Sequence, residues 1–78
     1  TVYGVLVQAA KENQLQLDCR GTYVAGISHL YEFDFGNLSG WMYRVNGVFP
    51  DVGCGEYQLS NGDRIEWLYT CDLGRDLP

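Results

Sequence analysis

The segment Trp41–Leu77 constrains the fold of this chain more than any other part of the sequence. It contains two runs in which apolar and polar residues alternate, a pattern typical of strands with one buried face. Asn46-Gly47 is the strongest two-residue hairpin signal in the chain, and the glycine of Ser60–Asp63 tolerates the positive φ of a tight turn. The pattern predicts a strand at Trp41–Asn46, a short return strand at Val48–Pro50, and a final, central strand with Ile65, Trp67, Tyr69 and Cys71 on one face.

The first half of the chain begins with a helical pattern. Apolar residues of TVYGVLVQAAKEN recur at i, i+3, i+4, i+7 and i+8, with Thr1 suited to the N-cap and Asn13 to the end of the helix. Alternation then predicts strands at Leu15–Cys19, Thr22–Ile27 and Leu30–Phe35, the last with its three aromatic residues on one face. One helix followed by several strands predicts an α+β fold, with the helix packed on a small, mostly antiparallel sheet.

Length and charge narrow the possible partners. The chain has 78 residues, enough for one domain, and its ten acidic and five basic residues give a net charge of −5. Because phosphate binding needs clustered Lys and Arg, the scattered charges argue against nucleic acid and against anionic membrane surfaces. No apolar run approaches the ~20 residues of a transmembrane helix, so we expect no membrane insertion.

The sequence offers no constellation of catalytic or metal-binding residues. His29 is the single histidine, and as a general base it would need a nucleophile and an orienting carboxylate within reach, so we expect a surface residue. The three cysteines lack zinc-site spacing, and the acidic residues lack the pattern of a calcium loop. We therefore expect no enzyme activity, no metal and no intrinsic cofactor.

The cysteines suggest a crosslink. Cys54 follows a glycine in a loop and Cys71 ends the final strand, and the hairpin between them can bring the two together. A disulfide that closes a loop of about 18 residues would stabilise the fold by ~3 kcal/mol, which is a large amount for so small a domain. The sequence thus predicts a Cys54–Cys71 disulfide, the alternative being independent thiols in a reducing compartment. Cys19 is either a buried free thiol or the partner of one of the others.

Aromatic residues form the candidate binding site. Large flat ligands are held by apolar contact and a few polar groups, and Trp and Tyr supply both. Tyr23 and Trp41 lie beside glycines or at strand starts, where exposure is expected, whereas Tyr43 and Trp67 lie mid-strand and favour the core. The alternative is that most of the set fills the core: Tyr23, Trp41, Tyr43, Phe49, Tyr57, Trp67 and Tyr69.

Four segments together resemble a known family. They are Thr1–Ala10, Tyr23–Ile27, Gly40–Pro50 and Tyr57–Trp67, and in this order they are similar to the transcobalamin C-terminal-like domain, also catalogued as the domain of unknown function 4430. The resemblance implies a β-grasp-like fold. It also implies an extracellular setting, in a secreted or cell-surface protein of several domains that is often bacterial.

The resemblance also implies a ligand. In vertebrate cobalamin carriers the similar domain closes over the corrin ring from one side, while a helical domain supplies the other. By position, Tyr23 and Val24 match one segment that faces the corrin, and Trp41 and Met42 match a second. We therefore expect a noncatalytic, extracellular module that caps a corrinoid together with another domain, with Tyr43 beside these residues. The alternative is a structural or adhesion module of a bacterial cell-surface protein that binds a protein or glycan.

One departure from the family pattern concerns the start of the chain. A β-grasp domain normally begins with a β-hairpin, whereas residues 1–78 begin at the helix. We expect a single domain cut from a longer protein, with the hairpin either absent or upstream. Without it, one sheet edge would be unpaired and open to strand addition or dimer formation.

Overall fold

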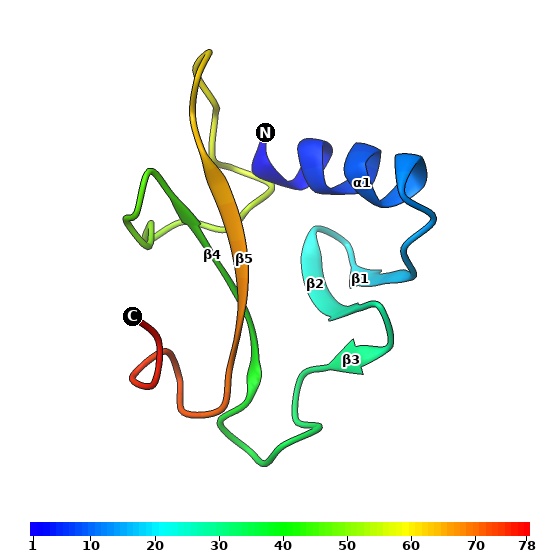
Figure 1. Cartoon of the computed structure of the whole chain (residues 1–78), viewed down its shortest axis with the longest axis vertical. Coiled ribbons are helices and arrows are strands. Elements are labelled where there is room, and N and C mark those ends of the chain that lie inside the picture. The colour runs from blue at the N-terminus through cyan, green and yellow to red at the C-terminus, as the bar shows by residue number, and fades with distance from the viewer.

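The computed structural model describes all 78 residues, Thr1–Pro78, as one helix and five strands (Figure 1). The α+β prediction is confirmed, while the finer expectation of a β-grasp stays a prediction. The strands form two antiparallel sheets rather than one, β1-β2-β3 and β4-β5. The helix is too short to cross a lipid bilayer. The elements are α1 (Val2–Glu12), β1 (Leu17–Arg20), β2 (Tyr23–Ile27), β3 (Leu30–Tyr31), β4 (Gly40–Val45) and β5 (Ile65–Thr70).

Helix α1 begins and ends where its capping residues predict. The Thr1 hydroxyl accepts a hydrogen bond from the Gly4 amide at 3.0 Å, which satisfies one of the free donors of the first turn. Asn13 closes the helix, and its amide donates to the Ala9 carbonyl at 3.0 Å. The buried stripe is narrower than predicted, because Val5 is 48% exposed. It consists of Val2, Leu6 and Ala10.

Strand β1 begins two residues later than predicted. The Leu15 amide donates to the Ala10 carbonyl at 2.9 Å, so the turn that ends the helix uses a donor that a strand would need. β1 then pairs with β2 from Leu17↔Ile27 to Arg20↔Tyr23, with a bulge after Asp18.

The predicted strand Leu30–Phe35 is wrong beyond its first two residues. The Tyr31 amide donates to the Asp34 carboxylate at 2.8 Å, which turns the chain, and Phe33 adopts a φ of 68°. Such local side-chain bonds compete with strand pairing. Phe33 and Phe35 are therefore exposed on a loop rather than on one face of a strand.

The Asn46-Gly47 turn is confirmed, but its return strand is wrong. Both residues have positive φ, and Val45 and Val48 exchange backbone hydrogen bonds of 2.9 and 3.0 Å. Val48–Pro50 contributes one isolated bridge. Strand β4 pairs instead with β5 along its whole length.

The turn before β5 is confirmed, whereas the central position of β5 is wrong. The Ser60 amide donates to the Asp63 carboxylate at 2.8 Å, and Gly62 has a φ of 88°. β5 pairs with β4 alone, so its other side is a sheet edge, and Cys71 lies just beyond its last residue.

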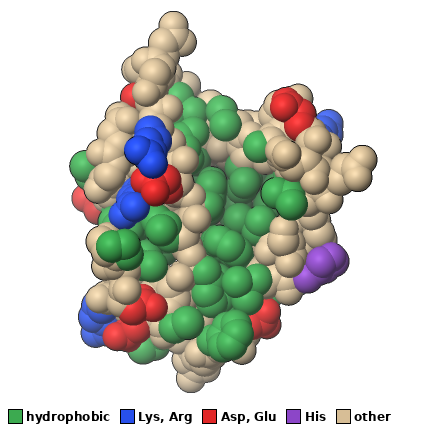
Figure 2. All heavy atoms as spheres, viewed as in Figure 1, with side chains coloured by type: hydrophobic (Ala, Val, Ile, Leu, Met, Phe, Trp, Pro, Cys, Tyr) green, Lys and Arg blue, Asp and Glu red, His purple; other side chains and the backbone are tan.

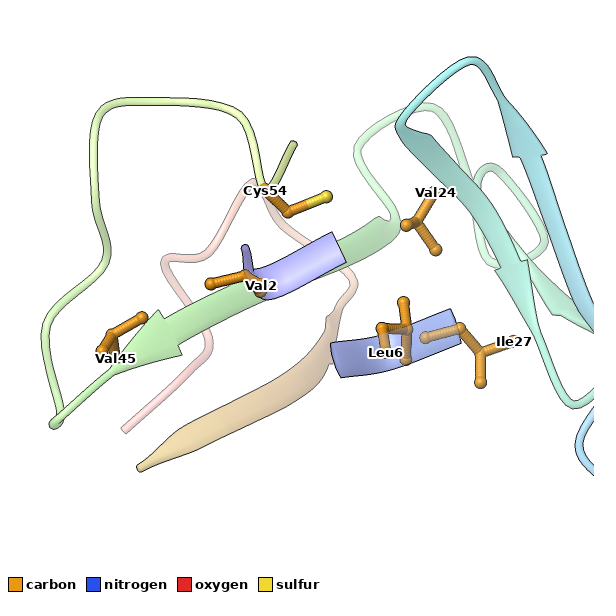
Figure 3. Close-up of a cluster of buried hydrophobic side chains, with 6 residues drawn as sticks. All are labelled: Val2, Leu6, Val24, Ile27, Val45 and Cys54. Atoms are coloured by element: carbon orange, nitrogen blue, oxygen red, sulfur yellow. The ribbon is translucent and has the colours of Figure 1, made fainter. Parts of the chain in front are cut away.

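A small core joins the helix to both sheets. Figure 3 shows side chains from α1, β2, the end of β4 and the following loop converging between the elements. Only 11 of the 78 residues are buried, so much apolar surface is left on the outside. The core cluster is Val2, Leu6, Val24, Ile27, Val45 and Cys54.

The three cysteines are free thiols, and the expected Cys54–Cys71 disulfide is not formed in this structure. Cys54 is buried, and its thiol lies 3.2 Å from the Thr22 carbonyl, which accepts its hydrogen bond. Cys71 is exposed beyond β5, where its amide donates to the Asp76 carboxylate at 2.9 Å. The two cysteines are thus held by different neighbours.

Candidate ligand-binding face

Two hollows that share Tyr23 and Trp41 lie between the sheets. The inner hollow has a volume of about 240 Å³ and the outer hollow about 410 Å³. On the face seen in Figure 2, apolar side chains gather in the hollowed middle and charged side chains lie toward the rim. The inner hollow is lined by Thr22, Tyr23, Val24, Trp41, Tyr43, Gly53, Cys54 and Trp67. Besides the two shared residues, the outer hollow is lined by Glu32, Phe33, Asn37, Leu38, Ser39, Gly40, Met42, Thr70 and Leu73.

Trp41 is held between the two sheets. Its indole N–H donates to the Leu30 carbonyl of β3 at 2.8 Å, although Trp41 itself belongs to β4. Its ring meets Tyr69 edge to face, with centroids 5.3 Å apart, and the Tyr69 hydroxyl donates to the Tyr31 carbonyl at 2.8 Å. Because these contacts fix the indole, a ligand that packs on it needs to order little of the protein.

Tyr43 and Trp67 form the back of the inner hollow. They are directly opposite in the β4-β5 register, with ring centroids 5.5 Å apart. Burial raises the pKa of Tyr43, whose hydroxyl donates to the Val52 carbonyl. Both rings pack against the core cluster, as expected from the sequence, and both also line the hollow.

The indole N–H of Trp67 is a buried donor without a hydrogen-bond partner. Buried polar groups in folded proteins are nearly always paired, and an unpaired one costs ~1–3 kcal/mol. The same side chain lines the inner hollow, so this unpaired donor belongs to a residue of the candidate site.

A polar cluster surrounds Tyr23, which lines both hollows. Tyr23 is 53% exposed, and the Arg20 guanidinium lies 4.9 Å from its ring centroid. The Glu32 carboxylate accepts hydrogen bonds from the Tyr23 hydroxyl at 3.1 Å and from Arg20 at 2.9 Å. Partial burial and the bond to Glu32 raise the pKa of Tyr23. The tyrosine therefore stays neutral at ordinary pH.

The loop at Gly53–Gly55 closes the inner hollow next to β2. A Cβ atom at Gly55 would lie 2.6 Å from the Thr22 hydroxyl oxygen, so glycine permits this close approach. Burial raises the pKa of the Cys54 thiol, which keeps it protonated and a poor nucleophile.

No group of three or more His, Cys, Asp or Glu side chains is placed to hold a metal ion. His29 is exposed in the β2–β3 turn and lines neither hollow.

The family model of the domain of unknown function DUF4430 matches residues 1–71. The chain belongs to this family. No curated protein and no solved structure matches it. The matched range contains α1, all five strands and, apart from Leu73, every residue that lines the two hollows.

In this DUF4430 domain, the residues predicted to bind ligand lie together with one exception. Tyr23, Val24, Trp41 and Tyr43 all line the inner hollow. Met42 lies on the opposite face of β4, contacts the tail near Gly74, and lines only the outer hollow.

Sequence reasoning misses several lining residues of the DUF4430 domain. It includes Trp67 in the aromatic set but favours the core for it, and it places Phe33 on one face of a strand rather than in the site. The β4-β5 register, which sets Trp67 opposite Tyr43, is the signal that the sequence lacks. Cys54 is interpreted from the sequence as half of a disulfide or as an independent thiol, whereas in the structure it lines the inner hollow.

Proposed function

We propose that this DUF4430 domain is a noncatalytic binding module whose aromatic face covers one side of a flat, largely apolar ligand. The observation that carries the proposal is the pair of hollows that share Tyr23 and Trp41 and remain open to solvent. An open face buries one side of a ligand, so a second surface has to supply the other. We assign that second surface to another domain of the same protein.

The free surface of the domain supports a partner on this face. Tyr23 and Phe33 are among the large apolar or aromatic side chains left exposed, and both line the outer hollow. Apolar patches of this kind mark binding surfaces in soluble domains.

A binding role fits the titratable groups of the face better than a catalytic role. Cys54 keeps its proton, and its thiol is tied to the Thr22 carbonyl. The Glu32 carboxylate is occupied by Arg20 and Tyr23. Nucleophilic catalysis requires a nucleophile beside a base that can accept its proton, and neither group has such a neighbour.

Corrinoids are the ligand class that we propose. The family resemblance noted in the sequence supports them, and so does their chemistry, since a corrin is a flat macrocycle edged by amide groups. Its flat face would pack on Trp41 and Tyr23, and an amide oxygen would accept from the unpaired Trp67 N–H. The same resemblance supports our placing the domain in a secreted or cell-surface protein.

An absorbance titration tests this proposal. Cobalamin and its precursor cobinamide are added to the protein at high concentration, because one half of a site binds weakly. We expect a saturable spectral change whose dissociation constant rises about tenfold or more in Trp41→Ala, as for a central aromatic contact. His29→Ala, outside both hollows, is the control and should bind as the unmodified chain does. Equal loss in both variants, or no spectral change, would contradict the corrinoid proposal.

A second candidate function rests on a different feature, the free edge of β5. Because β5 pairs with β4 alone, its outer edge presents unpaired backbone groups that a strand of another protein can extend. In this alternative the domain is a structural or adhesion module of a bacterial cell surface that binds a protein or glycan. Partner binding that survives Trp41→Ala would favour it over the aromatic face.

A further inference from the structure

Two of the three cysteines approach the same residue of the core. Cys19 lies directly opposite Val24 in the β1-β2 register, and side chains in such positions have Cβ atoms about 4.5–5.5 Å apart. In Figure 3 the sulfur of Cys54 points toward Val24. Cys54 and Val24 belong to the core cluster, and Cys19 packs against that cluster. Both cysteines therefore lie next to Val24, at the same corner of the core.

Backbone contacts hold the Cys54 loop against this corner. The Tyr3 amide donates to the Cys54 carbonyl at 2.9 Å, and the Cys54 thiol donates to the Thr22 carbonyl at 3.2 Å. Thr22 lies in the tight connection between β1 and β2, within three residues of Cys19. The loop is thus anchored both to α1 and to the hairpin that carries Cys19.

The titration of neighbouring groups agrees with this placement. The Cys19 thiol is the main cause of a raised pKa at the Tyr3 hydroxyl, and Cys54 also contributes. Burial raises the pKa of Cys54, and Cys19 adds to that rise. Tyr3 and Cys54 therefore both experience the charge of Cys19, which places Cys19 near both of them.

We propose that Cys19 and Cys54 form the disulfide of this domain under oxidising conditions and that Cys71 stays free. The bridge would tie β1 to the loop that closes the inner hollow. It replaces the Cys54–Cys71 pairing that the sequence predicts, because Cys71 lies exposed beyond the far end of β5. The proposal does not depend on the identity of the ligand.

A small-molecule disulfide such as oxidised glutathione is a sufficient oxidant. Cys19, the more exposed of the two thiols, loses its proton and attacks one glutathione sulfur, which forms a mixed disulfide and releases one glutathione thiolate. Cys54, whose raised pKa makes this the slower step, then loses its proton and attacks the Cys19 sulfur, which forms the protein disulfide and expels the second glutathione. Two protein thiols are oxidised, one glutathione disulfide is reduced to two thiols, and each thiolate released takes up one proton.

Tryptic peptide mapping distinguishes the possible pairings. Trypsin cuts after Lys and Arg, so Cys19, Cys54 and Cys71 fall in separate peptides, 12–20, 45–64 and 65–75. The chain is incubated with oxidised glutathione, alkylated and digested, and linked peptides are identified by mass. We expect peptide 12–20 linked to 45–64, with alkylation of Cys71 alone. A link between 45–64 and 65–75, a link between 12–20 and 65–75, or no link would overturn the proposal.

Matched variants complete the test. Cys71→Ser should leave the linked peptide unchanged, whereas Cys19→Ser should abolish it and leave two alkylated cysteines. Adding reductant should lower the thermal midpoint of the oxidised chain and of Cys71→Ser, but not that of Cys19→Ser. The alkylation pattern of the unmodified chain identifies the pairing by itself, so the test holds even where a variant fails to fold. Reductant sensitivity that persists in Cys19→Ser would also overturn the pairing.

Discussion

Val2→Ala tests the claim that a very small core anchors the helix between the two sheets. Val2 is fully buried at the start of α1, in the cluster that includes Val45 and Cys54. The substitution removes two methyl groups, worth ~0.8 kcal/mol each by transfer, and leaves a cavity. We expect the free energy of unfolding to fall by about 2–3 kcal/mol. This is a large share of the total of ~4–12 kcal/mol for a domain of this size.

Val5→Ala is the matched control, because it makes the same change in the same helix at a side chain that is 48% exposed. We expect its effect to stay within ~0.5 kcal/mol, since alanine is also the better helix former. Urea unfolding, followed by tryptophan fluorescence, measures the stability of both variants. With a slope of about 1 kcal/mol/M, the midpoint should fall by ~2–3 M in Val2→Ala alone. Similar midpoints for the two variants would refute the assignment of Val2 to the core.

Two further predictions concern packing and pH. Gly26→Ala should lower the stability measured by thermal unfolding by ~1–3 kcal/mol, because the new Cβ would lie 2.7 Å from the Tyr31 ring. Gly53→Ala is the control and should be nearly neutral, because no atom lies within 4 Å of its Cβ position. Hydrogen bonds from neighbouring amides and a hydroxyl lower the pKa of Asp63 and Asp76 in the folded chain. Their stabilisation is complete above the unfolded pKa of ~3.9 and is lost as the pH falls through the lower folded values. The urea midpoint should therefore drop below about pH 4, and a midpoint that stays constant down to pH 2 would contradict this reasoning.

Local signals make the helix and the turns predictable. Thr1 caps α1 with its own hydroxyl, Asn46-Gly47 adopts positive φ at both positions, and Asp63 closes its turn through its carboxylate. In each case the residue determines a conformation within a few positions of itself. The same kind of local bond, from Asp34, ends the strand that alternation alone would extend to Phe35.

Strand pairing is not predictable in the same way, because period-two alternation gives the faces of a strand but not its neighbour. The Asn46-Gly47 turn predicts that β4 pairs with a return strand, whereas β4 pairs with β5 some 20 residues farther on. The sequence therefore lists Trp67 in the aromatic set and favours the core for it, whereas the β4-β5 register sets it beside Tyr43 in the inner hollow. Tyr23 and Trp41 belong to the predicted site, because exposure at a strand start can be inferred from sequence.

NMR can show whether the face shared by the two hollows binds ligand. The chain has two tryptophans, and their indole N–H groups give separate signals. On addition of cobinamide we expect both indole signals to shift, Trp67 strongly as its unpaired N–H gains an acceptor, together with the Tyr23 and Val24 amides. Shifts confined to the outer edge of β5, or unchanged indole signals at saturating ligand, would contradict a binding role for this face.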